Sequence, residues 1–221
     1  MRNRGTALRD GDVWPVADVD CRQPVLLEVA EAELVALRHF PEEAFRQSSA
    51  IVQAGGNCGL WPRMFARLGF TVHTFEPDAT NMICLVQNCA AHLGEKVIPY
   101  MAALSNRIGW GTLTGAETNV GGYYLDPDAQ HGERARLVTI DDVIGMNEPV
   151  ALIQLDVEGA EVVALEGAQL TIGRCHPLLW LEDKGLTRRF GHDSAEGWLR
   201  ETWPRYSVVD RVGRDILLAW N

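Results

Sequence analysis

Residues 51–59, with the sequence IVQAGGNCG, join a short apolar run to a glycine-rich turn. The run predicts a buried strand over Ser49–Ala54, and the residues after the turn predict a helix over Leu60–Leu68. Glycines let the backbone of such a turn approach a ligand closely, and the N-terminus of the following helix offers free N–H groups. Gly55 and Gly59 are spaced as G-x-x-x-G, whereas a turn that wraps a pyrophosphate has G-x-G-x-x-G. The turn therefore favours a ligand other than NAD or FAD.

Short apolar runs alternate with amphipathic stretches from residue 50 onward, which is typical of βαβ units around a mostly parallel sheet. The last two runs, Tyr206–Val212 and Asp215–Trp220, flank a turn at Gly213-Arg214 and predict an antiparallel hairpin. We therefore expect an α/β fold. The other expected strands are Thr71–Phe75, Lys96–Leu104, Val150–Leu155 and Leu178–Leu181, and the other expected helices are Ala79–Leu93, Ala160–Gly167 and Ser194–Thr202.

The middle of the chain holds one of these helices and a segment whose structure stays open. One face of the helix is expected to pack in the core, and it carries Ile83, Val86, Ala90 and Leu93. Gly109–Leu125 is rich in Gly, Thr, Asn and Tyr. That composition is compatible with a β-rich excursion and with a loop on the substrate side.

Length and composition bound the organisation of the chain. Its 221 residues, 47% of them apolar, supply one sizeable core, so we expect one domain over residues 49–221. Residues 1–48, which include the amphipathic stretch Leu26–Arg38, are expected to form an extension that packs on one side of this domain. No apolar run is long enough for a membrane span, and no apolar signal core follows the N-terminus. We therefore expect a cytoplasmic protein without a membrane partner.

Charge and cysteine spacing weigh against two classes of site. A formal net charge of −10 disfavours a nucleic-acid partner, because affinity for nucleic acids depends on Lys and Arg that neutralise phosphates. The cysteines have neither a C-x-x-C pair nor zinc spacing, so we expect free buried thiols. They are Cys21, Cys58, Cys84, Cys89 and Cys175.

Glu76 follows the expected strand Thr71–Phe75 directly and stands twenty-one positions after Gly55. A carboxylate at the end of the second strand, about 20 residues past a glycine turn, is placed to accept hydrogen bonds from both hydroxyls of a ribose. The alternative is that Glu76 caps a helix or is simply solvated.

Residues 152–161, LIQLDVEGAE, put three carboxylates at the carboxyl end of a buried strand. Ligands of open α/β sheets bind beyond that edge. Carboxylates there suit a cationic ligand such as the sulfonium of S-adenosylmethionine. Glu158 and Glu161 can equally begin a helix and complement its dipole, so Asp156, at the tip of the strand, is the preferred functional residue.

Seven stretches resemble, in order and spacing, the FkbM family of S-adenosylmethionine-dependent methyltransferases. They are IVQAGGNCGLW, TFEPDATN, AALSNRIG, TIDDV, LIQLDVEGAE, ALEGA and LLWLEDK, and they span about residues 50–220. The resemblance implies a Rossmann-like class I methyltransferase fold with a mostly parallel seven-stranded sheet and a C-terminal antiparallel hairpin. It also implies S-adenosyl-L-methionine as cofactor and a hydroxyl group of a glycan or a small-molecule natural product as acceptor.

Matching to the family places the cofactor around ten residues. They are Gln53, Gly55, Gly56, Asn57, Gly59, Glu76, Pro77, Ala102, Ala103 and Asp156, with the backbone of Ala102 and Ala103 near the adenine. The chain departs from the family at Gln53, where an acidic residue is usual, and at Gly56, where Ala is usual. A glutamine accepts a hydrogen bond but carries no charge, so weaker cofactor binding is expected.

Transfer of a methyl group to an aliphatic hydroxyl requires a base, and Asp156 is the first candidate, ahead of Glu182 and His192. A salt bridge between Glu182 and Lys184 or Arg188 is an equal alternative for Glu182, and solvation is the alternative for His192. Asp156 with Glu182 or Asp183 could hold a divalent metal, although we expect none. Residues 121–124 could form an aromatic flap over the substrate or simply pack there.

Two other functions compete with an O-methyltransferase. Gln53 is compatible with a catalytically impaired module that only binds the cofactor. An RNA methyltransferase would need a basic concave face despite the acidic chain. The oligomeric state stays open.

Overall fold

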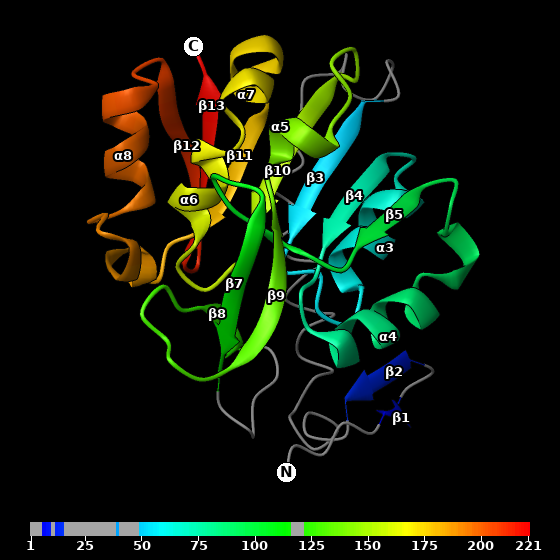
Figure 1. Ribbon diagram of the computed structural model, residues 1–221. Coiled ribbons are helices and arrows are strands. Elements are labelled where there is room, and N and C mark those ends of the chain that lie inside the picture. The colour runs from blue at the N-terminus through cyan, green and yellow to red at the C-terminus, as the bar shows by residue number, and fades with distance from the viewer. Residues whose placement is uncertain (1–5, 10–11, 16–38, 40–48, 116–121) are drawn as a thin grey trace.

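The computed structural model describes residues 6–9, 12–15, 39, 49–115 and 122–221. A seven-stranded sheet forms the centre of the fold (Figure 1), with the order β12-β13-β11-β10-β3-β4-β5. All neighbours from β11 to β5 pair in parallel, whereas β13 is antiparallel to both β11 and β12. The strands are β3 (Ala50–Ala54), β4 (Thr71–Phe75), β5 (Val97–Tyr100), β10 (Val150–Leu155), β11 (Leu178–Glu182), β12 (Tyr206–Val212) and β13 (Asp215–Trp220). The expected mostly parallel sheet with a C-terminal hairpin is confirmed.

Helices cover both faces of this sheet because its parallel strands are apolar on both sides. On one face, α3 (Leu60–Arg67) and α4 (Ala79–Asn88) pack on Ile51, Val72 and Leu152. The other face carries α5 (Ile140–Val143), α6 (Glu161–Glu166), α7 (Gln169–Cys175) and α8 (Ala195–Thr202). Short 3₁₀ helices follow at Ala90–His92 and Leu186–Phe190.

A second sheet, of order β6-β9-β7-β8, contributes residues to the cavity at the carboxyl ends of β3, β4 and β10. Its strands are β6 (Ala103–Leu104), β7 (Gly109–Thr114), β8 (Tyr124–Leu125) and β9 (Glu133–Val138), and Figure 1 shows it in green in front of the main sheet. The open question about Gly109–Leu125 is thus answered for its described residues, which include two strands.

The expectation of one strand over Lys96–Leu104 was wrong. β5 ends at Tyr100, and the N–H of Ala102 donates back to the carbonyl of Tyr100 at 2.9 Å. This tight turn redirects the chain, so β6 leaves the main sheet and pairs with β9. The apolar run therefore serves two different sheets.

The expected apolar face of the helix Ala79–Leu93 was right only in part: Val86 and Leu93 pack against the core, whereas Ile83 and Ala90 are exposed. α4 already ends at Asn88, and Ile83 is 50% exposed, while Met82, Leu85 and Cys89 face the core. The opposite side is covered as well, because Cys84 packs with Trp14. A helix buried on two sides, partly by cysteines that act as small apolar residues, does not show a single aliphatic stripe.

The described part of the N-terminal 48 residues includes a hairpin of β1 (Thr6–Arg9) and β2 (Asp12–Pro15) beside α4 (Figure 1). The N–H of Val13 donates to Asn88 Oδ1 at 2.7 Å, and Arg63 forms two hydrogen bonds with Asp12. Leu26–Arg38 and Cys21 lie outside the described residues, so the boundary at residue 48 stays a prediction.

Two further features concern the described residues alone. Among them, Cys58, Cys84 and Cys89 are buried and Cys175 is half-buried, and these four cysteines are not joined by disulfides. Within the same part of the chain, every helix is too short or too polar to cross a lipid bilayer.

Candidate functional site

The glycine turn after β3 is wedged between the carboxyl ends of β4 and β10. The N–H groups of Gly55 and Gly56 both donate to the carbonyl of Phe75, at 3.1 and 3.0 Å. Gly55 has φ +83°, and a Cβ atom there would lie 2.0 Å from the carbonyl oxygen of Asp156. No side chain fits at this position, so the close approach of the turn to β10 requires glycine.

Glu76 is a buried carboxylate, 5% exposed, immediately after β4. Its Oε2 accepts the N–H of Asn57 at 2.7 Å, and its Oε1 accepts the N–H of Asp78 at 2.9 Å. Burial raises the pKa of Glu76 to about 7, although these hydrogen bonds oppose the rise. The cap of α4 is Asp78, whose carboxylate accepts the N–H groups of Thr80 and Asn81. Glu76 therefore is not a helix cap, and its remaining lone pairs can accept hydrogen bonds from a ligand.

A cavity opens at this edge of the sheet, with about 630 Å³ of empty space when its mouth is included. Of the predicted cofactor residues, Gly55, Asn57, Glu76, Pro77, Ala102, Ala103 and Asp156 line it. The lining is completed by Ala54, Phe75, Asn81, Leu104, Leu113, Tyr123, Tyr124, Leu125, Val157, Glu158 and Ala160.

Much of the added lining comes from the second sheet, which the sequence did not predict as a wall of the site. Its signals in the sequence were the composition of Gly109–Leu125, which left a β-rich excursion and a substrate-side loop open, and the tyrosine pair of the possible flap. Tyr123 packs with Leu113 and Leu125, and the Arg189 guanidinium stacks over the Tyr124 ring at 3.8 Å. Gly121, the first residue of the possible flap, lies outside the described residues.

The structure does not bring Gln53, Gly56 or Gly59 to the cavity. Gln53 is completely buried, where its Nε2 donates to the carbonyl of Gly55 at 3.1 Å and its Oε1 accepts the Thr74 hydroxyl. A Cβ atom at Gly56 would lie 2.6 Å from Leu85 Cδ1 and 2.8 Å from Thr74 Oγ1. Gln53 and Gly56 therefore support the glycine turn on the side that faces away from the cavity.

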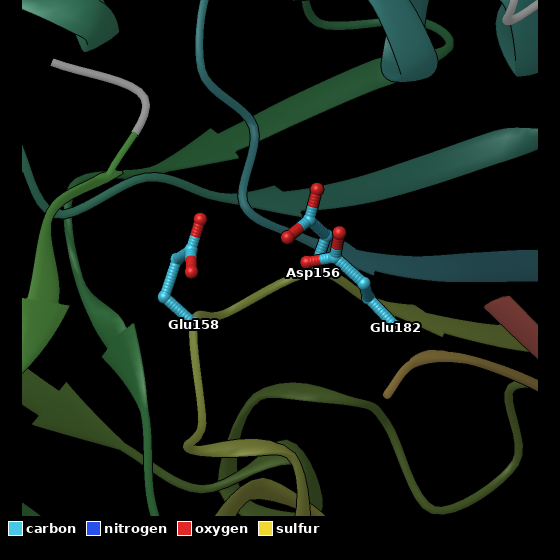
Figure 2. A group of neighbouring side chains, drawn as sticks. All are labelled: Asp156, Glu158 and Glu182. Atoms are coloured by element: carbon cyan, nitrogen blue, oxygen red, sulfur yellow. The ribbon is translucent and has the colours of Figure 1, made fainter. Parts of the chain in front are cut away.

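Three carboxylates from two segments meet at the carboxyl ends of β10 and β11: Asp156, Glu158 and Glu182. One oxygen of each lies within 4.8 Å of the others, and Figure 2 shows Asp156 beside Glu182 with Glu158 facing them. Asp156 keeps 43% of its side chain exposed, toward the cavity. Desolvation, a hydrogen bond with Glu182 and the charge of Glu182 raise the pKa of Asp156 well above its ordinary value.

Lys184 joins this group. Its Nζ lies 2.6 Å from Glu182 Oε2, 2.8 Å from Glu158 Oε1 and 4.0 Å from Asp156 Oδ1. Burial opposes its charge, but the hydrogen bonds to Glu158 and Glu182 raise the pKa of Lys184 overall. The predicted alternative of a salt bridge between Glu182 and Lys184 is therefore present, and Glu182 itself does not line the cavity.

His192 is not part of this group. It lines a different cavity, where its Nε2 lies 3.7 Å from Glu166 Oε1. Glu161 begins α6, and its buried carboxylate accepts the N–H groups of Val157 and Gly159. Burial raises the pKa of Glu161 to about 7. Glu161 thus holds the loop that follows β10.

The matches with known proteins agree with this geometry. The methyltransferase FkbM domain matches residues 53–202. Methyltransferase FkbM from Methylobacillus flagellatus KT is 18% identical, with a TM-score of 0.55 over 79% of this chain and 44% of that chain. Monomeric WbdD is 12% identical, with a TM-score of 0.52 over 91% of this chain and 42% of that chain.

The chain spans less than half the length of these two structures. No curated protein matched the sequence. At these identities the structural likeness shows the fold, a class I methyltransferase fold. The domain match covers most of the chain, so this protein belongs to the FkbM methyltransferase family.

Proposed function

We propose that the chain binds S-adenosylmethionine and transfers its methyl group to a hydroxyl of a small molecule or glycan. One observation carries the proposal: the glycine turn, Glu76 and Asp156 line a single cavity at the sheet edge where α/β proteins bind ligands. Family membership supports the methyl donor, and the net charge of −10 supports an acceptor outside the nucleic acids.

The residues of the cavity fit this donor. Glu76 presents a fixed carboxylate suited to two ribose hydroxyls, and the bare backbone at Gly55 leaves room beside Asp156. Pro77, Ala102 and Ala103 offer small apolar surfaces of the kind that a purine packs on. The carboxylate of Asp156 gives the cationic half of the donor an opposite charge. When bound, the donor supplies an activated methyl group with a neutral thioether as leaving group.

Asp156 acts as the base in this proposal. Its Oδ atoms accept the proton of the acceptor hydroxyl as the new C–O bond forms. Desolvation and Glu182 raise the pKa of Asp156, which makes its carboxylate a stronger proton acceptor than an ordinary one. Glu182 is less suited, since it is held by Lys184 outside the cavity lining.

Gln53 gives no support to a catalytically impaired module. The Gln53 amide is hydrogen-bonded to Gly55 and Thr74 and does not line the cavity. A glutamine in place of an acidic residue therefore removes no charge from the cavity itself.

Asp156→Asn tests the proposal, with labelled S-adenosylmethionine and a panel of hydroxylated acceptors. The variant keeps the shape but loses the proton acceptor, so we expect cofactor affinity within about tenfold of wild type and turnover lower by roughly 10²–10⁴. If affinity and turnover fall together, Asp156 mainly holds the cofactor. Full turnover of the variant across pH 6 to 9 would remove Asp156 from the mechanism.

A further inference from the structure

We infer that Lys184 is a positioning residue of this site. Its ammonium group occupies the position that a metal cation would take among Asp156, Glu158 and Glu182, and it keeps Asp156 available as a base. The inference rests on the proposed function for its catalytic meaning, but its structural part does not.

The contacts of Lys184 are those of a central counter-ion. Its Nζ is within 2.8 Å of Glu158 and Glu182, which come from the loops after β10 and β11, and it lies 4.0 Å from Asp156. A divalent cation held by these carboxylates would have to occupy the position of that ammonium group. Lysine and metal are therefore mutually exclusive here.

The backbone on both sides of Lys184 is fixed. The N–H of Asp183 donates to the carbonyl of Arg214 at 2.9 Å, and Asp183 Oδ1 accepts the N–H of Gly185 at 3.1 Å. Across the group, Arg189 donates to the carbonyl of Glu158 at 3.1 Å. With a side chain only 23% exposed, Lys184 is built into the site and is not a mobile surface lysine.

The choice of lysine follows from its shape. An ammonium is a compact point charge with three donors, and it fits between carboxylates that approach from different directions. The planar fork of arginine suits one carboxylate face-on. Lys184 and Lys96 are the two lysines of the chain, and the Lys96 ammonium donates to the Gly69 carbonyl, outside this group.

The single charge of Lys184 matters for the reaction. Three carboxylates this close repel one another, and the ammonium relieves the repulsion without cancelling it. Negative charge thus remains toward the cavity for a cationic methyl donor, whereas a divalent ion would repel that donor. The same ammonium lowers the pKa of Asp156, whereas desolvation and Glu182 raise it. Lys184 therefore keeps more of the base deprotonated.

Manganese binding tests the structural part, using Mn²⁺ alone and the full chain. We expect wild type and the control Lys96→Ala to bind no Mn²⁺ at this site in paramagnetic resonance titrations. Lys184→Ala should bind one Mn²⁺ there, with an affinity on the order of 100-fold or more above the upper limit that the titration sets for wild type, because three carboxylates lose their counter-charge. The double variant Glu182→Gln/Lys184→Ala should lose that ion again. The inference is overturned if wild type binds one Mn²⁺ and neither variant loses that ion. The wild-type titration tests the inference even if Lys184→Ala does not fold.

The pH profile of turnover tests the catalytic part. Lys184→Met removes the charge that lowers the pKa of Asp156, so the acidic limb of the profile should move to higher pH by about one unit or more. Lys184→Arg keeps the charge and should leave the acidic limb close to its wild-type position. An unmoved limb in Lys184→Met overturns the positioning role. Failure of the proposed function would differ, because wild type itself would then bind no S-adenosylhomocysteine.

Discussion

Buried polar residues behind the glycine turn are matched to the hydrogen-bonding character of their partners. Glu76 faces two N–H donors, for which a carboxylate is suited, whereas Gln53 faces a carbonyl and a hydroxyl. The spacing from Gly55 predicted the place of Glu76, because it reflects the length of one βα unit. Sequence alone could not show that Gln53 points away from the cavity, since that depends on its neighbours across the sheet.

Gln53→Glu should destabilise the protein, even though an acidic residue is usual in the family. A carboxylate at this fully buried position has no N–H to donate to the Gly55 carbonyl, so it must repel that oxygen or take up a proton. We expect a loss of roughly 1–3 kcal/mol in the free energy of unfolding, larger at pH 8 than at pH 5. Urea unfolding measures it, with the exposed Gln87→Glu as control. Unchanged stability together with tighter S-adenosylhomocysteine binding would show that residue 53 contacts the cofactor after all.

Glu76 should make the ligand-free protein less stable as the pH rises. Burial raises its pKa from 4.5 to about 7 in the folded state. Between these values the folded protein keeps a proton that the unfolded chain has lost, so this contribution to stability is full below about pH 4.5 and disappears as the pH rises through about 7.

Glu76→Gln lacks that titration. Relative to the variant, wild type should therefore lose up to about 3 kcal/mol of unfolding free energy between pH 4.5 and pH 8. Urea unfolding at several pH values measures the difference, with the exposed Glu95→Gln as control. Parallel pH curves for wild type and Glu76→Gln would mean that the buried carboxylate does not carry a raised pKa.

Secondary-structure elements explain why some family motifs are present without touching the cavity. In the motif TIDDV, Thr139 caps α5, and Asp141 accepts hydrogen bonds at the start of α7. In the motif ALEGA, a Cβ atom at Gly167 would lie 2.1 Å from the Ser105 carbonyl oxygen. Asp141 thus connects α5 with α7, and Gly167 lets the end of α6 approach the residue that follows β6. Resemblance alone therefore does not separate residues that stabilise the fold from residues of the site.

Most strands of the main sheet were predictable because they are largely apolar runs between turn residues, and β12 and β13 because they flank the turn at Gly213-Arg214. The second sheet was not, because β6 and β8 have two residues each and are paired by partners distant in sequence. Strands so short carry no period. The sequence consequently left a β-rich excursion and a substrate-side loop both open for Gly109–Leu125, whereas it predicted the strand-end residues Glu76 and Asp156.

Asp141→Ala should weaken the fold and leave the ligand site intact. The carboxylate accepts the N–H groups of Leu170 and Thr171 and the Thr171 hydroxyl, at 2.8–2.9 Å. Loss of such a cap should lower the free energy of unfolding by about 2 kcal/mol. Chemical unfolding and S-adenosylhomocysteine titration are the two measurements, with the exposed Asp128→Ala as control. A large loss of ligand affinity in the folded variant would place Asp141 in the binding machinery.

For the whole molecule, the order of the strands fixes where the parts of the site meet. β3 is central, the chain passes from it to β4 on one side, and β10 pairs with its other edge. Ligands of open α/β sheets bind at such a reversal of strand order. Gly55 and Asp156 flank this point. The topology of the sheet, and not nearness in sequence, brings Glu76 and Asp156 to the same cavity. The second sheet, which Figure 1 shows in front of the main sheet, adds Leu104, Leu113 and Leu125 to the lining of the cavity.

Ligand binding at this point should stabilise the entire domain, because a ligand that binds only the folded state shifts the unfolding equilibrium by mass action. At a concentration of 100 times its dissociation constant, S-adenosylhomocysteine should add about 2.7 kcal/mol, which for a domain of this size raises the melting temperature by roughly 5–10 °C. NAD should give no shift, since the G-x-x-x-G turn lacks the spacing that wraps a pyrophosphate. Glu76→Ala should remove most of the shift, because it removes the acceptor proposed for the ribose hydroxyls and lowers affinity by roughly 1.5–3 kcal/mol. Thermal unfolding monitored by tryptophan fluorescence measures all three cases, and a shift with NAD but none with S-adenosylhomocysteine would overturn the proposed cofactor.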